Sequence, residues 1–299
     1  MSLVEYSVKE RVGYITLNRP EKRNALSHEL VSELKTHFER AEQDEHVKVI
    51  VLNANGDSFC AGADLGYLQQ LQNFSYEENL ADSHHLKDLF LKIYTLKKVV
   101  IAQVQGHALA GGCGLATVCD FAFAVPEAKF GYTEVRIGFI PALVAVFLVR
   151  KIGEQRARQL LLTGEIIKAE EALERGLITK VVPPTKLDSS VFDFAQNLIQ
   201  SNSTQSMQLT KQLIADVQGK TLTEALDMAA TLNAKARATD DCKKGVAAFL
   251  NKEKYPGKQP ILTVTKHPPI IPIFDCDIIR DTQTILGLSA LPFLAARNH

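Results

Sequence analysis

The stretch Gly106-His-Ala-Leu-Ala-Gly-Gly-Cys-Gly-Leu115 follows the mostly apolar run at residues 99–104, which reads as a strand buried on both faces. A similar stretch, Gly56-Asp-Ser-Phe-Cys-Ala-Gly-Ala-Asp-Leu65, follows the apolar run at 48–52. Glycine permits tight turns and close backbone contacts. Each pattern therefore predicts a strand that leads through a turn into a helix.

Such turns suit a developing negative charge, because the first N–H groups of a helix have no partner inside the helix. Two of these turns that converge would form an oxyanion hole, although each alone also fits a purely structural turn. Neither stretch contains the G-x-G-x-x-G pattern of dinucleotide sites or a P-loop, so the sequence disfavours phosphate binding of those kinds.

The flanking regions place these turns in an α/β protein. Residues 12–17 read as a strand, and Ser27 is a suitable N-cap for a helix with an apolar face. From Gly153 onward the pattern is mostly helical, with helical periodicity at 186–201, 204–218 and 221–250. Strands that alternate with helices, followed by helices alone, predict an α/β core and a helical C-terminal subdomain.

The composition excludes several classes of protein. Lys+Arg and Asp+Glu both number 34, so no overall charge favours nucleic acid or an anionic membrane. No apolar run is long enough to span a bilayer, and the N-terminus lacks the features of a signal peptide. The five cysteines are scattered and match no zinc pattern. We expect a cytoplasmic protein without a metal site, a nucleic-acid partner or a membrane partner.

Four motifs in a fixed order identify a family. These are Asn18-Arg-Pro-Glu-Lys-Arg-Asn-Ala-Leu26, Phe59-Cys-Ala-Gly-Ala-Asp-Leu65, the 106–115 stretch, and Phe130-Gly-Tyr-Thr-Glu-Val-Arg-Ile-Gly138. Together they resemble the enoyl-CoA hydratase/isomerase (crotonase) superfamily over about residues 3–255. The resemblance implies a crotonase fold of repeated ββα units and assembly into homotrimers or dimers of trimers.

By this resemblance we divide the chain into a core at 1–200 with the CoA site, a helical subdomain at 201–255, and an extension at 256–299. The extension holds six of the eleven prolines and falls outside the resemblance. No permanent cofactor is implied, because coenzyme A enters as part of an acyl-CoA substrate.

The resemblance also implies roles for particular residues. The backbone amides of Ala63 and Gly111 would form the oxyanion hole. The CoA channel would be lined, largely through the main chain, by Arg23, Ala25, Ala61, Asp64 and Leu65. An aromatic residue and a lysine three positions apart on the last helix would reach CoA from a neighbouring subunit, and Phe249 and Lys252 have that spacing. A core phenylalanine beside a solvated lysine is the alternative for this pair.

Position 114 departs from the two-glutamate hydratases of the family, which carry a glutamate where this chain has Gly114. Their second glutamate matches Glu134, which would act as the general acid and base. A single glutamate also occurs in the family's Δ3,Δ2-enoyl-CoA isomerases, in some decarboxylases, and in hydratase-like members that act on branched or carboxylated acyl chains. With its turn at 138–145, this chain looks most like the methylglutaconyl-CoA hydratase-type branch. We expect an enoyl-CoA hydratase, with an isomerase or a non-catalytic acyl-CoA-binding homologue as the alternatives.

Overall fold

The computed structural model describes residues 2–253, so the predicted extension at 256–299 lies outside the described residues. The larger of two sheets has the strand order β1-β2-β3-β5-β7-β10. Its strands are β1 (Val4–Lys9), β2 (Val12–Leu17), β3 (Val49–Ala54), β5 (Val99–Val104), β7 (Phe121–Ala124) and β10 (Lys180–Val181). Only β1 pairs antiparallel to its neighbour, and the strand predicted at 99–104 is confirmed.

The smaller sheet has the order β4-β6-β8-β9. Its strands are β4 (Ser58–Cys60), β6 (His107–Leu109), β8 (Lys129–Gly131) and β9 (Ile166–Lys168). Each of β4, β6 and β8 follows a strand of the larger sheet and precedes a helix or 3-10 helix. This repeated ββα order confirms the predicted fold class.

The first helices follow the strands in sequence. They are α1 (His28–Gln43), α2 (Leu65–Leu71), α3 (Tyr76–Thr95), α4 (Gly111–Val118), α5 (Ala142–Ile152), α6 (Glu154–Thr163) and α7 (Ala169–Glu174). Ser27 caps α1 as predicted, because its side chain accepts a hydrogen bond from the N–H of Leu30. The 3-10 helix η2 (Glu134–Ile137) follows β8 and carries the predicted catalytic glutamate.

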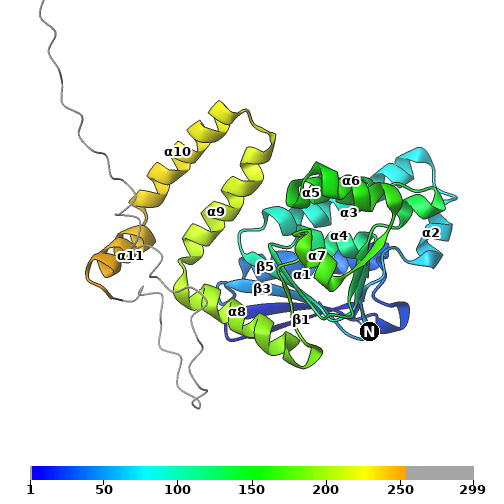
Figure 1. Ribbon diagram of the computed structural model, residues 1–299, viewed down its shortest axis with the longest axis horizontal. Helices are drawn as coiled ribbons and strands as arrows, with labels where there is room; N and C mark the ends of the chain where they lie inside the picture. The colour runs from blue at the N-terminus through cyan, green and yellow to red at the C-terminus, as the bar shows by residue number, and fades with distance from the viewer. Residues whose placement is uncertain (1, 254–299) are drawn as a thin grey trace, which may run out of the picture. The chain divides into compact units, whose positions relative to one another are not determined.

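The C-terminal region is helical, as predicted. It contains α8 (Leu187–Ser201), α9 (Thr204–Asp216), α10 (Leu222–Ala238) and α11 (Asp240–Leu250). The continuous periodicity at 221–250 hides a break, because Thr239 is extended and its side chain caps α11. Helix α8 packs against β2, β3, β5 and β7, and Figure 1 shows α3 and α4 on the other side of these strands.

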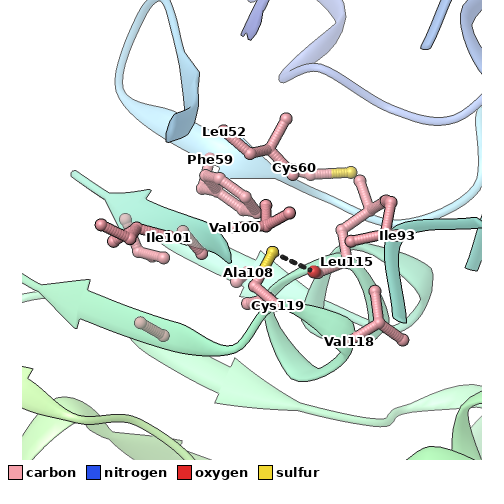
Figure 2. Close-up of a cluster of buried hydrophobic side chains, with 14 of the residues drawn as sticks. Leu52, Phe59, Cys60, Ile93, Val100, Ile101, Ala108, Leu115, Val118 and Cys119 are labelled. Atoms are coloured by element: carbon pink, nitrogen blue, oxygen red, sulfur yellow. Dashed lines mark hydrogen bonds between the residues drawn. The ribbon is translucent and has the colours of Figure 1, made fainter. Parts of the chain in front are cut away.

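The main core lies between the two sheets and around α4. Every residue of β5 is buried, as expected for a strand covered on both faces. Figure 2 shows Phe59 and Cys60 of β4 gathered with Val100 of β5 and Leu115 of α4. This packing fixes the start of α4 relative to the end of β4. The two turns predicted to form the oxyanion hole lie at these two points.

None of the helices in residues 2–253 is both long and apolar enough to cross a membrane.

Candidate active site

The two glycine-containing turns lie against each other. A Cβ atom on Gly62 would come within 2.9 Å of the Cβ of Ala110, and Gly62 has a φ of +94°. A Cβ on Gly112 would come within 2.1 Å of the carbonyl oxygen of Cys60. Side chains at these two positions would push the turns apart, so glycine is required for their contact.

Leu26 contacts both predicted amide donors. It forms an isolated parallel bridge with Ala63, in which its N–H donates to Gly62 (2.7 Å) and its carbonyl accepts from Asp64 (2.9 Å). Its Cδ1 lies 2.9 Å from the point where a Cβ of Gly111 would be. Ala63 and Gly111 therefore approach the same leucine from two different elements.

The N–H groups of both predicted amide donors are unpaired in the described part of the chain. The N–H of Ala63 and the N–H of Gly111 make no hydrogen bond to another group within residues 2–253. Gly111 is the first residue of α4, and its amide carries part of the positive end of the helix dipole. Ala63 is exposed, so its amide is reachable by a ligand.

Ala110, which precedes this amide, has an uncommon backbone conformation. Its φ is +48° and its ψ is −124°, a region that residues with a side chain rarely adopt. Such a conformation costs about 1–3 kcal/mol and persists where the surrounding structure holds it. Here the N–H of Ala110 donates to the carbonyl of Gly131 (2.7 Å), which pairs this turn with the end of β8.

The segment that leads from β8 to Glu134 is joined to α4 and to the turn before it. Tyr132 is fully buried, and its hydroxyl lies 2.6 Å from Oγ1 of Thr117 in α4. Together with the bond between Ala110 and Gly131, this contact holds the two consecutive residues at the start of the short segment that leads to Glu134. Sequence reasoning did not identify this contact between Tyr132 and Thr117.

Glu134 is half-buried, and its Oε2 is buried without a hydrogen-bond partner among the described residues. Burial raises the pKa of this carboxyl above its ordinary value of 4.5. An unpaired buried oxygen costs free energy unless a water or a ligand satisfies it. Its raised pKa also brings the carboxyl closer to the range of a proton-transfer catalyst.

Gly114 is buried within α4, and the space around it is filled by apolar side chains. A Cβ at this position would lie 2.4 Å from Cγ1 of Val144 and 3.1 Å from Cζ of Phe90. Val144 comes from α5 and Phe90 from α3, so neither is near Gly114 in sequence. The side chain of a glutamate at 114 would therefore begin in volume that Val144 occupies.

The predicted CoA-channel residues lie along two adjacent segments. The N–H of Ala61 donates to the carbonyl of Arg23 at 3.0 Å, which joins residues 23–26 to residues 61–64. Ala25 is buried, whereas Arg23 is exposed and has a left-handed φ of +50°. These backbones are thus side by side.

Asp64 and Leu65 continue this edge in different ways. Asp64 is buried, caps α2 by accepting from the N–H of Tyr67 (3.0 Å) and pairs with Arg19 (2.9 Å). Although burial raises the pKa of Asp64, the Tyr67 N–H and the Arg19 charge hold it below its ordinary value. Its carboxylate therefore has a structural role, and any contact with CoA would be made by its main chain. Leu65 is 78% exposed, which leaves its side chain free for a ligand.

Phe249 and Lys252 lie apart from these residues in the fold. Phe249 is 81% exposed near the end of α11, which packs against α9 and α10. Lys252 is also exposed, just beyond the helix. The alternative of a core phenylalanine is therefore wrong, since Phe249 belongs to no core of the described residues.

A cavity of about 730 Å³ lies at the other end of α4 and contains none of the predicted site residues. It is lined by residues 117–121 and by parts of α3, α5, α8 and α9. Among residues 2–253, no group of three or more His, Cys, Asp or Glu residues is placed to hold a metal ion.

These features define a class of α/β protein built from repeated ββα units, with two close glycine-containing turns and a half-buried glutamate on the segment after β8. The chain belongs to the enoyl-CoA hydratase/isomerase family, since the family's sequence profile matches residues 7–260.

Individual relatives agree with this assignment. A Thermus thermophilus relative is 41% identical over 244 residues, which cover 82% of this chain and 96% of the relative. The crotonyl-CoA hydratase of Syntrophomonas wolfei is 35% identical, with coverages of 82% and 94%. The crystal structure of an enoyl-CoA hydratase from Mycobacterium smegmatis has a TM-score of 0.80 and 32% identity, and it covers 85% of this chain and 98% of its own.

Proposed function

We propose that this protein is a hydro-lyase that adds water across the α,β double bond of an enoyl-CoA thioester. The observation that carries the proposal is the buried Oε2 of Glu134, which has no hydrogen-bond partner among the described residues. The segment leading to this glutamate is bonded to the turn that precedes the free amide of Gly111. Relatives that are named as hydratases support it, since this chain matches them over most of their length.

In the proposed reaction, the thioester oxygen accepts hydrogen bonds from the N–H groups of Ala63 and Gly111. These bonds stabilise the negative charge that the oxygen gains as the β-carbon is attacked. Glu134 removes a proton from water, the resulting hydroxide bonds to the β-carbon, and the double bond shifts to form the enolate. Glu134 then returns the proton to the α-carbon, so one carboxyl serves both proton transfers.

The substitution Glu134→Gln tests this role. It keeps the shape of the side chain but removes its basicity, so we expect turnover of an enoyl-CoA to fall by about 10²–10⁴-fold. Calorimetric binding of the CoA thioester should persist. The control is Glu127→Gln, an exposed glutamate in the turn before β8, which should leave turnover unchanged. Equal turnover by wild type and Glu134→Gln would rule out the proposed mechanism.

A Δ3,Δ2-enoyl-CoA isomerase is the second candidate, favoured by the apolar filling around Gly114. Without a carboxylate there, Glu134 alone would move a proton between two carbons of the acyl chain. Incubation with a 3-enoyl-CoA distinguishes the two reactions. A 2-enoyl product with no 3-hydroxy product indicates isomerisation, and binding without any turnover indicates a non-catalytic acyl-CoA-binding homologue.

We also propose that the chain acts as a homotrimer or a dimer of trimers, in which Phe249 and Lys252 reach the CoA of a neighbouring subunit. The high exposure of Phe249 supports this, since large apolar side chains on a surface often mark contacts. Sedimentation velocity measures the assembly. Phe249→Ala should weaken CoA binding without changing the fold of the core.

A further inference from the structure

Helix α2 begins two residues after the proposed donor Ala63, and it packs only loosely against the other residues that the structure describes. None of its seven residues is buried, and Leu65 at its start is 78% exposed. Short helices depend on tertiary contacts, because nucleation is unfavourable and few hydrogen bonds repay it. The position of α2 therefore depends on the few polar contacts that it makes.

One such contact joins α2 to α3. The hydroxyl of Tyr67 donates a hydrogen bond to the Asp82 carboxylate. Within residues 2–253 it is the one side-chain hydrogen bond between these two helices. Burial raises the pKa of the Tyr67 phenol, and the bond to Asp82 raises it further. The phenol therefore stays protonated at neutral pH and can donate.

Asp82 is a well-anchored acceptor. It lies on the 20-residue helix α3, which buries Leu89, Phe90 and Ile93 in the core. Nδ1 of His28, from α1, lies 4.0 Å from the Asp82 carboxylate. The ring of His28 stacks on that of His85 at 4.2 Å between centroids. The acceptor of the Tyr67 hydroxyl thus sits where α1 and α3 meet.

We propose that Tyr67 is a positioning residue whose hydrogen bond to Asp82 holds α2, and with it the backbone from Ala63 to Leu65, in the orientation that binds an acyl-CoA thioester. This inference rests on the proposed function, since it assigns these backbones to the substrate. Tyr67 acts through α2 and needs no contact with the reacting atoms. A shift of the Ala63 amide by about 1 Å would weaken its hydrogen bond to the thioester oxygen.

The test is Tyr67→Phe, which removes only the hydroxyl. A hydrogen bond to a charged group contributes enough that its loss should raise the Kd for enoyl-CoA by roughly tenfold. We also expect kcat to fall, because the Ala63 amide is proposed to stabilise the charge that develops on the thioester oxygen. Hydrogen–deuterium exchange of the amides at 65–71 should become faster. The melting temperature of the full chain should stay within about 1 °C, because α2 buries no apolar side chain.

Three further variants separate positioning from a general loss of stability. Tyr76→Phe makes the same chemical change at a tyrosine that is 75% exposed nearby, and it should behave as wild type. Asp82→Asn keeps an oxygen that can accept the hydrogen bond, so it should restore most of the affinity that Asp82→Ala loses. The double variant Tyr67→Phe/Asp82→Ala should be no weaker than Asp82→Ala, since both remove the same interaction.

Wild-type Kd in Tyr67→Phe, or unchanged amide exchange at 65–71, would overturn the proposal. A wild-type protein that turns over no enoyl-CoA would contradict the proposed function instead. In that case amide exchange and the Kd for a CoA thioester still decide the role of Tyr67, because neither measurement needs catalysis.

Discussion

The two ends of α4 differ in how their backbone groups are satisfied. At the C-terminal end, Nζ of Lys151 donates to the carbonyls of Thr117 (2.9 Å) and Cys119 (2.8 Å). At the N-terminal end, the amide of Gly111 makes no hydrogen bond within residues 2–253. The Lys151 ammonium satisfies carbonyl groups at one end of the helix, whereas the amide at the other end is free to bind a ligand.

This difference indicates that the C-terminal end of α4 contributes to stability, whereas its N-terminal end is suited to binding a ligand. Unsatisfied helix ends are normally capped by side chains or water. The Lys151 ammonium performs this task even though burial lowers its pKa. Within the described part of the chain, the start of α4 has no side-chain cap, and the buried Oε2 of Glu134 also has no hydrogen-bond partner. The amide of Gly111 thus remains unused at the start of α4, whereas the carbonyls at its other end are satisfied.

The largest effect should come from removing the amide donor with Gly111→Pro. Proline is well suited to the first position of a helix, so the substitution removes an N–H while keeping α4. We expect kcat to fall by about 10²–10³-fold. Gly111→Ala is the control, because it keeps the N–H and adds only a Cβ near the flexible end of Leu26. Equal losses in the two variants would show that crowding, not the donor, matters.

At the opposite end, Lys151→Met should reduce stability and leave the chemistry intact. It leaves the carbonyls of Thr117 and Cys119 without the hydrogen bonds from Lys151, and we expect a loss of about 2 kcal/mol in the free energy of unfolding. Denaturant titration measures this loss, and kcat per folded molecule should not change. Arg150→Met at the exposed neighbouring position should cost below about 0.5 kcal/mol. A large fall in kcat for Lys151→Met would mean that the two ends are not independent.

Between the two ends, Gly114→Ala should destabilise the chain by about 1–2 kcal/mol, because its Cβ overlaps Val144. Val144→Ala in the same chain should recover part of this loss. Thermal unfolding of the two single variants and the double variant gives the coupling energy. Strictly additive losses would show that Val144 is not the obstacle.

The smallest effect concerns the stability cost of Glu134. Its folded pKa is raised, so the folded chain holds a proton that the unfolded chain releases as the pH rises above 4.5. Wild-type stability must therefore fall across the window above that pH. Glu134→Gln avoids this loss and should melt about 1–2 °C higher at pH 7, with the gain disappearing toward pH 4. A gain that is largest in acid would contradict the assigned shift.

Local signals in the sequence predicted much of the fold. The Ser27 cap, the strand at 99–104 and the helix predicted at 186–201, which the structure begins at Leu187, each depend on neighbouring residues. The strands of the small sheet went unpredicted individually, because three residues such as Ser58–Cys60 are too short to show a period. The break at Thr239 left a readable signal, since threonine before two aspartates is a good helix start.

The candidate site was predicted less completely. The family motifs pointed to Glu134, but its unpaired oxygen depends on what surrounds it in space. The contact of Leu26 with both turns, and the filling of the Gly114 site by Val144 thirty positions later, join residues distant in sequence. No local pattern encodes such packing.

The contact between Gly114 and Val144 also constrains how this protein can evolve. A second acid at position 114 would first collide with Val144, and a smaller residue at 144 alone would open a cavity. Either single change costs stability before the pair can offer any advantage. The chain is thus separated from a two-acid catalyst by an epistatic barrier, and the two substitutions would have to arise together or on a stabilised background.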